Sequence, residues 1–256
     1  MSSPDPPAPP TKPVARGLSL LAVVLGGALI TALIASLDET YENVQAGNGV
    51  AAFDRPVLDW MVAHRTPALD SVVTAFTNLG SATWMPVIAT IVTVLLAWRW
   101  RRWTPVVLMV VATLGSLVMT RAGKVLTARA RPPQVDAVPP YETTPSFPSG
   151  HTLNATVIAL VLAYLVLLYV PSRAGRVTTA LGLVAFALAM GTSRVFLGHH
   201  WLTDVLAGWA AGAAWAGVVV LGHRLLLLLL GRRERHERHE EAAGQAAGHS
   251  GVAPTD

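Results

Sequence analysis

Residues 193–204 read Ser193-Arg194-Val195-Phe196-Leu197-Gly198-His199-His200-Trp201-Leu202-Thr203-Asp204 and lie between two long apolar runs. They include an arginine, two histidines and an aspartate. Ionisable side chains are costly at membrane depth, so their presence beside apolar runs indicates a functional site. Two further polar segments interrupt apolar sequence, at residues 124–132 and 148–151. We expect the three polar segments to belong to one site.

The composition of the 256-residue chain indicates a membrane protein with several spans. Charged residues make up 13% of the sequence, about half the fraction in a typical soluble domain. The absence of cysteine excludes disulfides, thiolate nucleophiles and cysteine-ligated metals. The net charge of +4 fits a protein with basic cytoplasmic loops. No basic helix is interleaved with aromatic residues, so nucleic acid is not an expected partner.

The apolar runs predict six membrane-spanning helices, because one span needs ~20 apolar residues. Between the first two, residues 38–68 predict a polar connection with a short interfacial helix. Gly80-Ser81 indicates a break or an entry point in the second span. The predicted fold is therefore an all-α, six-transmembrane-helix bundle over residues 17–230. The expected spans are 17–37, one within 69–98, 104–123, 151–170, 177–190, and one from residue 201 through the 220s.

The sequence at both ends of the chain predicts cytoplasmic tails. Residues 1–16 are rich in proline, and residues 231–256 are charged and then rich in alanine and glycine. We expect the first to be disordered, and the second to be disordered beyond one or two helical turns. Six spans place both tails on one side, and that side holds more arginine and lysine than the other. The pattern predicts a multi-pass protein of the cytoplasmic membrane with both termini in the cytoplasm.

The order of the spans brings the polar segments to one face of the membrane. Lys124 and Arg131 follow the third span, and His151 opens the fourth. Arg194 follows the fifth span, and His200 opens the sixth. All of them should therefore reach the extracytoplasmic face, where we place the active site.

His200 and Asp204 have the spacing of a catalytic pair. Four residues apart at a helix start, they lie about 40° apart around the axis, whereas His199 and Asp204 lie about 140° apart. Asp204 can fix the tautomer of His200 and leave its other nitrogen as a nucleophile. His151 has no carboxylate near it in sequence, which suits a general acid. We interpret His199 as a residue that lines the pocket.

The remaining polar residues suit an anion. Lys124, Arg131 and Arg194 are cations without acidic partners nearby in sequence, and guanidinium groups match phosphate oxygens. Ser149 and Gly150 would offer a hydroxyl and free N–H groups at a helix N-terminus. Such a set could support phosphoryl transfer without a metal or another cofactor. A simpler interpretation of a single Lys124 or Arg194 is a helix-end residue that reaches the interface.

A metal site is the alternative for the histidines. His151, His200 and Asp204 could form a two-histidine, one-carboxylate set. Three cations nearby would repel a metal ion, so we favour the metal-free interpretation.

Taken together, the segments read Lys124-x6-Arg131-Pro132, Pro148-Ser149-Gly150-His151 and Ser193-Arg194-x5-His200-x3-Asp204. This resembles the three-part signature of the type 2 phosphatidic acid phosphatases, or lipid phosphate phosphatases, with every position filled. The resemblance implies metal-independent removal of phosphate from a membrane lipid phosphate or diphosphate. It implies a phosphohistidine on His200, oriented by Asp204, with His151 as the acid. It assigns phosphate binding to the set Lys124, Arg131, Ser149, Gly150 and Arg194.

The resemblance leaves the substrate and the acceptor open. The candidate substrates that it implies are phosphatidate, phosphatidylglycerophosphate, diacylglycerol diphosphate and polyprenyl diphosphates. A phosphotransferase of the same architecture would pass the phosphoryl group to an alcohol in place of water. A non-catalytic lipid-binding or transport protein is a third interpretation, but no internal repeat supports it. Nothing in the sequence predicts an oligomeric state.

Overall fold

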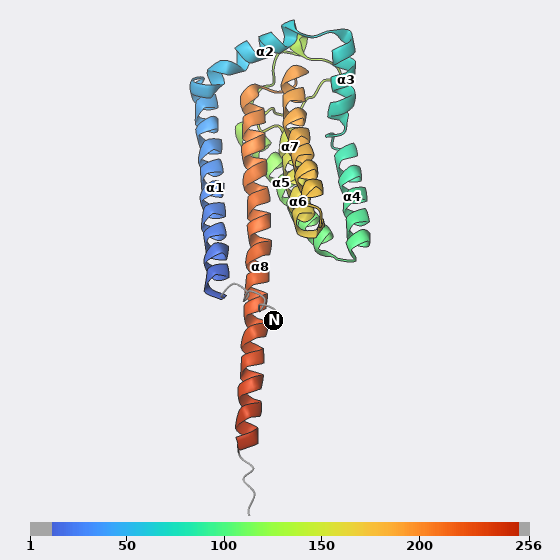
Figure 1. Cartoon of the computed structure of the whole chain (residues 1–256). Helices are drawn as coiled ribbons and strands as arrows, with labels where there is room; N and C mark the ends of the chain where they lie inside the picture. The colour runs from blue at the N-terminus through green and yellow to red at the C-terminus, as the bar shows by residue number, and fades with distance from the viewer. Residues whose placement is uncertain (1–11, 251–256) are drawn as a thin grey trace, which may run out of the picture.

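The computed structural model describes residues 12–250, with side chains described for 24–230, and no β-strand occurs in that range. The long helices run along one axis, α2 lies across one end of the bundle, and α3 follows it at the same end, above α4 (Figure 1). The elements are α1 (Lys12–Ala46), the 3-10 helix η1 (Gly49–Phe53), α2 (Asp54–Ala63), α3 (Pro67–Asn78), α4 (Trp84–Trp100), α5 (Thr104–Thr127), the 3-10 helix η2 (Gln134–Asp136), α6 (Gly150–Tyr169), α7 (Arg173–Phe196) and α8 (Leu202–Ser250).

Several of these helices suit a membrane. Five are long and apolar enough to cross it, and α4 is a shorter apolar helix of 17 residues. Large apolar side chains remain exposed on the outer faces of α4, α5 and α7, as expected for surfaces in contact with lipid. The five candidate spans are Val24–Ala46, Thr104–Thr127, Gly150–Tyr169, Arg173–Phe196 and Leu202–Leu230.

Three expected boundaries are wrong in the first third of the chain. Helix α1 begins at Lys12 and continues to Ala46, so residues 12–16 are not disordered and 38–46 are not part of a connection. The expected second span is two helices, because α3 ends at Asn78 and α4 begins at Trp84. The break lies at the predicted Gly80-Ser81. The expected short helix in this connection is observed as α2, and its place at the membrane interface stays a prediction. Residues 1–11, the rest of the predicted tail, lie outside the described residues.

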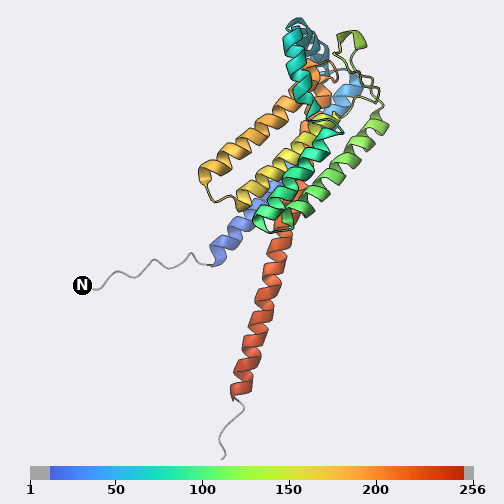
Figure 2. The same cartoon turned by 90° about the vertical axis from the view of Figure 1, so that its right-hand side faces the viewer.

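The prediction for the C-terminal tail is also wrong over residues 231–250. Helix α8 continues without interruption to Ser250 and runs well past the other helices (Figure 1, Figure 2). This extension and the start of α1 lie at the end of the bundle opposite α2 and α3 (Figure 1). Residues 251–256, the rest of this predicted tail, lie outside the described residues.

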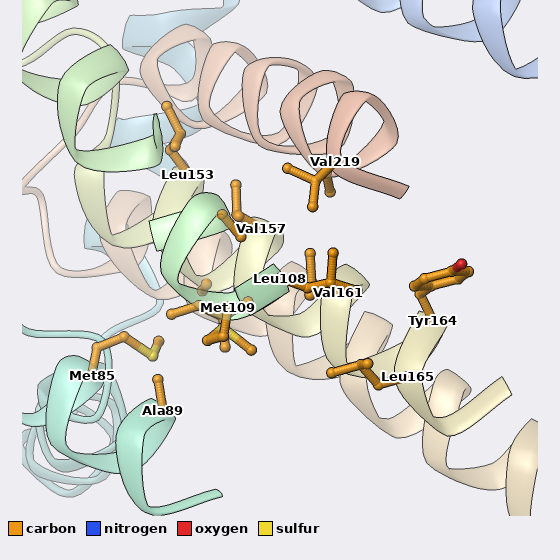
Figure 3. Close-up of a cluster of buried hydrophobic side chains, with 14 of the residues drawn as sticks. Met85, Ala89, Leu108, Met109, Leu153, Val157, Val161, Tyr164, Leu165 and Val219 are labelled. Carbon is orange, nitrogen blue, oxygen red and sulfur yellow. The ribbon is translucent and has the colours of Figure 1, made fainter. Parts of the chain in front are cut away.

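Helix α6 forms the centre of the bundle. Figure 3 shows Leu153, Val157, Val161 and Leu165 of α6 in one apolar cluster with residues of α4, α5 and α8. These four residues recur every four positions, so they occupy one stripe of the helix. Polar residues gather at the start of α6, beyond one end of this cluster. The packing of the cluster therefore holds in place the helix that carries them.

Glycines bring α8 close to α6. A Cβ at Gly208 would lie 2.9 Å from the Cβ of Thr152, and one at Gly212 would lie 2.8 Å from the Cβ of Thr156. Small residues let helix backbones approach in a membrane, where burial of apolar side chains gives little driving force. The two helices that begin at the polar segments are thus held together near those segments.

A glycine also shapes the turn between α7 and α8. Gly198 has φ +69°, and a Cβ there would lie 2.2 Å from the carbonyl oxygen of Asp136. We expect Gly198→Ala to lower the free energy of unfolding by about 2–4 kcal/mol, because strain and a backbone clash add. The apparent Tm in detergent would measure the loss. Gly182→Ala is the control, since nothing lies within 4 Å of a Cβ there. A Tm equal in both variants would contradict this account.

Candidate active site

The three polar segments meet at the end of the bundle that α2 and α3 close. Lys124 lies in the last turn of α5, and Arg131 lies in the α5–α6 loop, residues 128–149. His151 lies in the first turn of α6. Arg194, expected after the fifth span, lies within the last turn of α7, and Asp204 lies in the first turn of α8. Hydrogen bonds join the three segments, from Arg131 to the His199 carbonyl and from the Ser149 N–H to the Asp204 carbonyl.

His200 and Asp204 form the expected pair. The Nδ1 of His200 lies 3.2 Å from Oδ2 of Asp204, and both side chains are almost completely buried. The Nε2 of His200 lies 3.1 Å from Nη1 of Arg131. Because a guanidinium group can only donate, Nε2 accepts this bond and the ring proton belongs on Nδ1. The nitrogen that faces the cations therefore carries the lone pair.

The surroundings of His200 keep its ring neutral. Burial lowers the pKa of His200 well below its usual value, and the charges of Arg131 and Arg194 lower it further. His199 is not an alternative partner of Asp204, since its Nε2 lies 2.7 Å from the carbonyl oxygen of Val138. The structure thus separates the two neighbouring histidines as their helical spacing predicts.

Asp204 is surrounded by hydrogen-bond donors. Its Oδ2 accepts from the backbone N–H of Trp201 at 2.9 Å and from the hydroxyl of Ser146. Its Oδ1 accepts from Nη1 of Arg129 at 2.5 Å. A carboxylate that accepts several bonds is fixed in position. Asp204 can therefore orient the ring of His200 without movement of its own.

Arg129 and Asp54 are site residues that the sequence analysis missed. Nη2 of Arg129 lies 2.6 Å from Oδ2 of Asp54, which belongs to α2. Asp54 also accepts from the backbone N–H and the hydroxyl of Thr203, at 2.8 and 2.7 Å. It thereby caps the start of α8. Asp54 and Arg129 are 75 residues apart, and no motif or periodic pattern links them.

The cations of the site are held by the α5–α6 loop. The Nζ of Lys124 donates to the hydroxyl of Thr144 at 3.0 Å and to the carbonyl oxygen of Pro145. Arg131 donates from Nε to the carbonyl oxygen of Thr144 at 2.7 Å. Arg194 donates from Nη1 to the hydroxyl of Thr77 at 3.1 Å. Lys124 and Arg131 are therefore positioned by the same two loop residues.

Glu142 is the third missed residue, and it supplies the acidic partner that the cations lack among their neighbours in sequence. Its Oε2 lies 2.7 Å from Nη2 of Arg131, and its Oε1 pairs with Nη2 of Arg194. Burial alone would raise the pKa of Glu142, but the charges of Arg194 and Arg131 lower it to about 2. Glu142 is thus ionised. Its only sequence signal was an acid in the loop between two motifs.

The remaining expected residues make fewer contacts. The hydroxyl of Ser149 accepts from the hydroxyl of Thr152 at 2.9 Å and is not hydrogen-bonded to the cations. Gly150 begins α6, and a Cβ there would lie 3.0 Å from Thr120. His151 forms no hydrogen bond or ion pair with a carboxylate in the described part of the chain. Residues 24–230 also hold no group of three His, Asp or Glu side chains placed to bind a metal ion.

A helical membrane bundle with a buried histidine–aspartate pair beside arginine and lysine defines a membrane phosphatase of the lipid phosphate class. The comparisons with known proteins agree. The PAP2 superfamily model matches residues 104–226. Phosphatidylglycerophosphatase B of Bacillus subtilis (strain 168) is 32% identical over 168 residues, 64% of this chain and 80% of that protein. The chain belongs to the PAP2 superfamily, the type 2 phosphatidic acid phosphatases, as its motifs predicted.

Two solved structures support the fold. The transmembrane PAP2 type phosphatidylglycerolphosphate phosphatase from Bacillus subtilis superposes with a TM-score of 0.69 at 26% identity, covering 74% of this chain and 93% of that chain. Aquifex aeolicus LpxE superposes with a TM-score of 0.50 at 21% identity, covering 66% and 95%, and supports the fold alone. The chain is accordingly a hydrolase of the lipid phosphatase type.

Proposed function

We propose that this protein removes the terminal phosphate of phosphatidylglycerophosphate, or of a closely related lipid phosphate, through a phosphohistidine on His200. The observation that supports this proposal is the geometry of His200, whose Nδ1 faces Asp204 at 3.2 Å and whose Nε2 faces the cations. The names of the similar Bacillus subtilis protein and of the similar Bacillus subtilis structure favour phosphatidylglycerophosphate among the candidate lipids. Phosphatidate and polyprenyl diphosphates are the comparison substrates.

In the first step, Nε2 of His200 attacks phosphorus and the bond from phosphorus to the lipid oxygen breaks. His151 gives its proton to that oxygen, so the lipid leaves as an alcohol. Asp204 stabilises the positive charge on the ring of His200. Lys124, Arg131 and Arg194 balance the charge on the phosphoryl oxygens, together with Ser149 and the N–H groups at Gly150. Arg131 must leave Nε2 before the attack, because it donates to the same lone pair.

In the second step, water replaces His200 on phosphorus. His151, now neutral, takes a proton from the attacking water, and the phosphorus–nitrogen bond breaks. Inorganic phosphate is released, and both histidines return to their first states. No step in this scheme requires a metal ion.

The membrane arrangement belongs to the same proposal. Six spans result when α4 is counted with the five longer helices, and its 17 residues extend about 25 Å. The start of α1 and the extension of α8 lie at the same end of the bundle, which fits two cytoplasmic termini (Figure 1). The site at the opposite end would then face the extracytoplasmic side.

Phosphate release by the detergent-purified protein tests the function. With EDTA present, we expect release from phosphatidylglycerophosphate, with kcat/KM at least about 10-fold above that for a polyprenyl diphosphate. Phosphatidate measures the contribution of the glycerol headgroup. Loss of activity in EDTA would contradict the metal-independent scheme. A preference for the polyprenyl diphosphate would contradict the substrate assignment.

A further inference from the structure

Glu142 occupies the cation pair that the proposed function assigns to phosphate. Its two carboxylate oxygens contact two different arginines, Arg131 at 2.7 Å and Arg194. The first arginine comes from the α5–α6 loop and the second from the end of α7. The carboxylate therefore lies between two segments that must both contact the substrate.

A carboxylate and a phosphate compete for such a pair. Both present two oxygens at a spacing that guanidinium groups match, and both carry negative charge. Two anions a few ångströms apart in a buried site repel each other strongly. A lipid phosphate that reached Arg131 and Arg194 through the same nitrogens would therefore expel the carboxylate of Glu142.

The arginine pair still has unused donor capacity. The side chain of Arg194 is only 2% exposed, and its buried Nε has no hydrogen-bond partner in the described structure. A buried donor without a partner is uncommon and points to a missing acceptor. Phosphate has three oxygens available where Glu142 has two, so it can bind the donor that Glu142 leaves free.

Glu142 also holds Arg131 over the nucleophile. The same guanidinium group pairs with Glu142 through Nη2 and donates through Nη1 to Nε2 of His200. While this arrangement persists, the lone pair that would attack phosphorus is occupied. Release of Arg131 from Glu142 would free both the arginine and the histidine for the substrate.

The segment that carries Glu142 has few bonds to its backbone. The Val138 N–H donates to the Leu197 carbonyl, and the Thr144 and Pro145 carbonyls accept from Arg131 and Lys124. In the described structure, no hydrogen bond reaches the backbone of residues 139–143 between these points. The side chain of Glu142 is 29% exposed, so a path to solvent is open.

We propose that Glu142 is an internal counter-anion of the empty phosphate site, and that the phosphate of the incoming lipid displaces it. Every phosphate-bearing ligand must displace the carboxylate of Glu142, and this lowers the affinity of the site for all of them. Glu142 therefore acts as a specificity residue. A lipid substrate can offset the loss through contacts of its glycerol and acyl groups, whereas inorganic phosphate cannot. Glu142 therefore favours the release of product and the selection of lipid-borne phosphate. This inference rests on the proposed function only in assigning Arg131 and Arg194 to phosphate.

Binding of inorganic phosphate to the purified full-length protein tests the inference without turnover. We expect Glu142→Gln to bind inorganic phosphate about 10-fold more tightly than the wild type, measured by calorimetry or by the rise in Tm. Asp136→Asn is the matched control, because it removes one charge from the same loop at a residue that pairs with Arg55. Its affinity should stay within about 2-fold of the wild type. Equal affinity in Glu142→Gln and the wild type would overturn the proposal.

A measurement on the wild type covers the case in which Glu142→Gln does not fold. Inorganic phosphate should speed amide hydrogen exchange at residues 141–144, because the segment loses two ion pairs. Unchanged or slower exchange there would overturn the displacement. If the protein released no phosphate from any lipid but both binding results held, the proposed function would fail and the counter-anion role would stand.

Discussion

Replacing His200 with alanine is expected to lower kcat for lipid phosphate hydrolysis by at least about 10⁴-fold. The variant lacks the imidazole whose Nε2 lies beside Arg131 and whose Nδ1 faces Asp204. Water would have to attack the lipid phosphate directly, without the phosphohistidine that divides the reaction into two steps. Single-turnover phosphate release with excess enzyme would measure the loss. A quench in alkaline detergent, in which a phosphohistidine survives, should show label on the wild type and none on His200→Ala when the phosphate of the lipid carries the label.

His199→Ala is the control, because His199 is the neighbouring histidine and is buried to a similar extent. Its ring contacts the Val138 carbonyl and not Asp204. We expect a loss of kcat below about 10-fold for this variant. Equal losses in the two variants would mean that the turn between α7 and α8 had collapsed, and would remove the support for His200 as the nucleophile.

Asp204→Asn should lower kcat by about 10³-fold, although the side chain keeps its size. Every partner of the two carboxylate oxygens is a donor, namely Arg129 on one side and Trp201 N–H, Ser146 and His200 on the other. An asparagine must turn its NH₂ group toward one of these sides. Toward Arg129 it opposes a donor, and toward His200 it forces the ring proton to Nε2, where Arg131 already donates. Neither orientation leaves the nucleophile intact.

The kinetics of Asp204→Asn distinguish orientation from binding. We expect kcat to fall while KM changes little, because Asp204 does not contact the phosphate cations in the proposed scheme. Asp59→Asn is the control, since Asp59 is half-exposed and pairs only with Arg55, at 2.7 Å. A rise in KM with unchanged kcat would place Asp204 in substrate binding and contradict its role as the orienting residue.

The residues of the site that sequence could predict are those on regular helices or in fixed motifs. His200 and Asp204 pair across the start of α8, as a spacing of four allows, although His200 lies two residues before the helix begins at Leu202. Lys124, Arg131 and Arg194 meet because alternate spans end at the same face of the membrane. Helical periodicity and the order of the spans carry this information directly, and the observed contacts confirm the grouping. The roles of these residues in catalysis stay predictions.

Glu142, Arg129 and Asp54 could not be predicted for a shared physical reason. Glu142 and Arg129 lie in an irregular loop, where no periodicity relates sequence spacing to direction. Asp54 meets Arg129 only because α2 folds over the end of the bundle. The length of α8 could not be predicted, because the charged and then Ala/Gly-rich composition after residue 230 indicates disorder, whereas the helix continues through the charged residues. The break between α3 and α4 was visible as Gly80-Ser81, but the exact ends depend on packing.

The close approach of α6 and α8 at Gly208 and Gly212 fixes the distance between the starts of these two helices. The proposed acid and nucleophile stand at the starts of these two helices, so their separation is determined by backbone packing below them and not by flexible side chains. The surrounding lipid can vary in chain length or order without altering that separation. Variation among substrates must instead be absorbed by the α5–α6 loop. A larger residue at Gly208 would therefore alter the chemistry of every substrate alike, whereas a change in the loop would alter the preference among them.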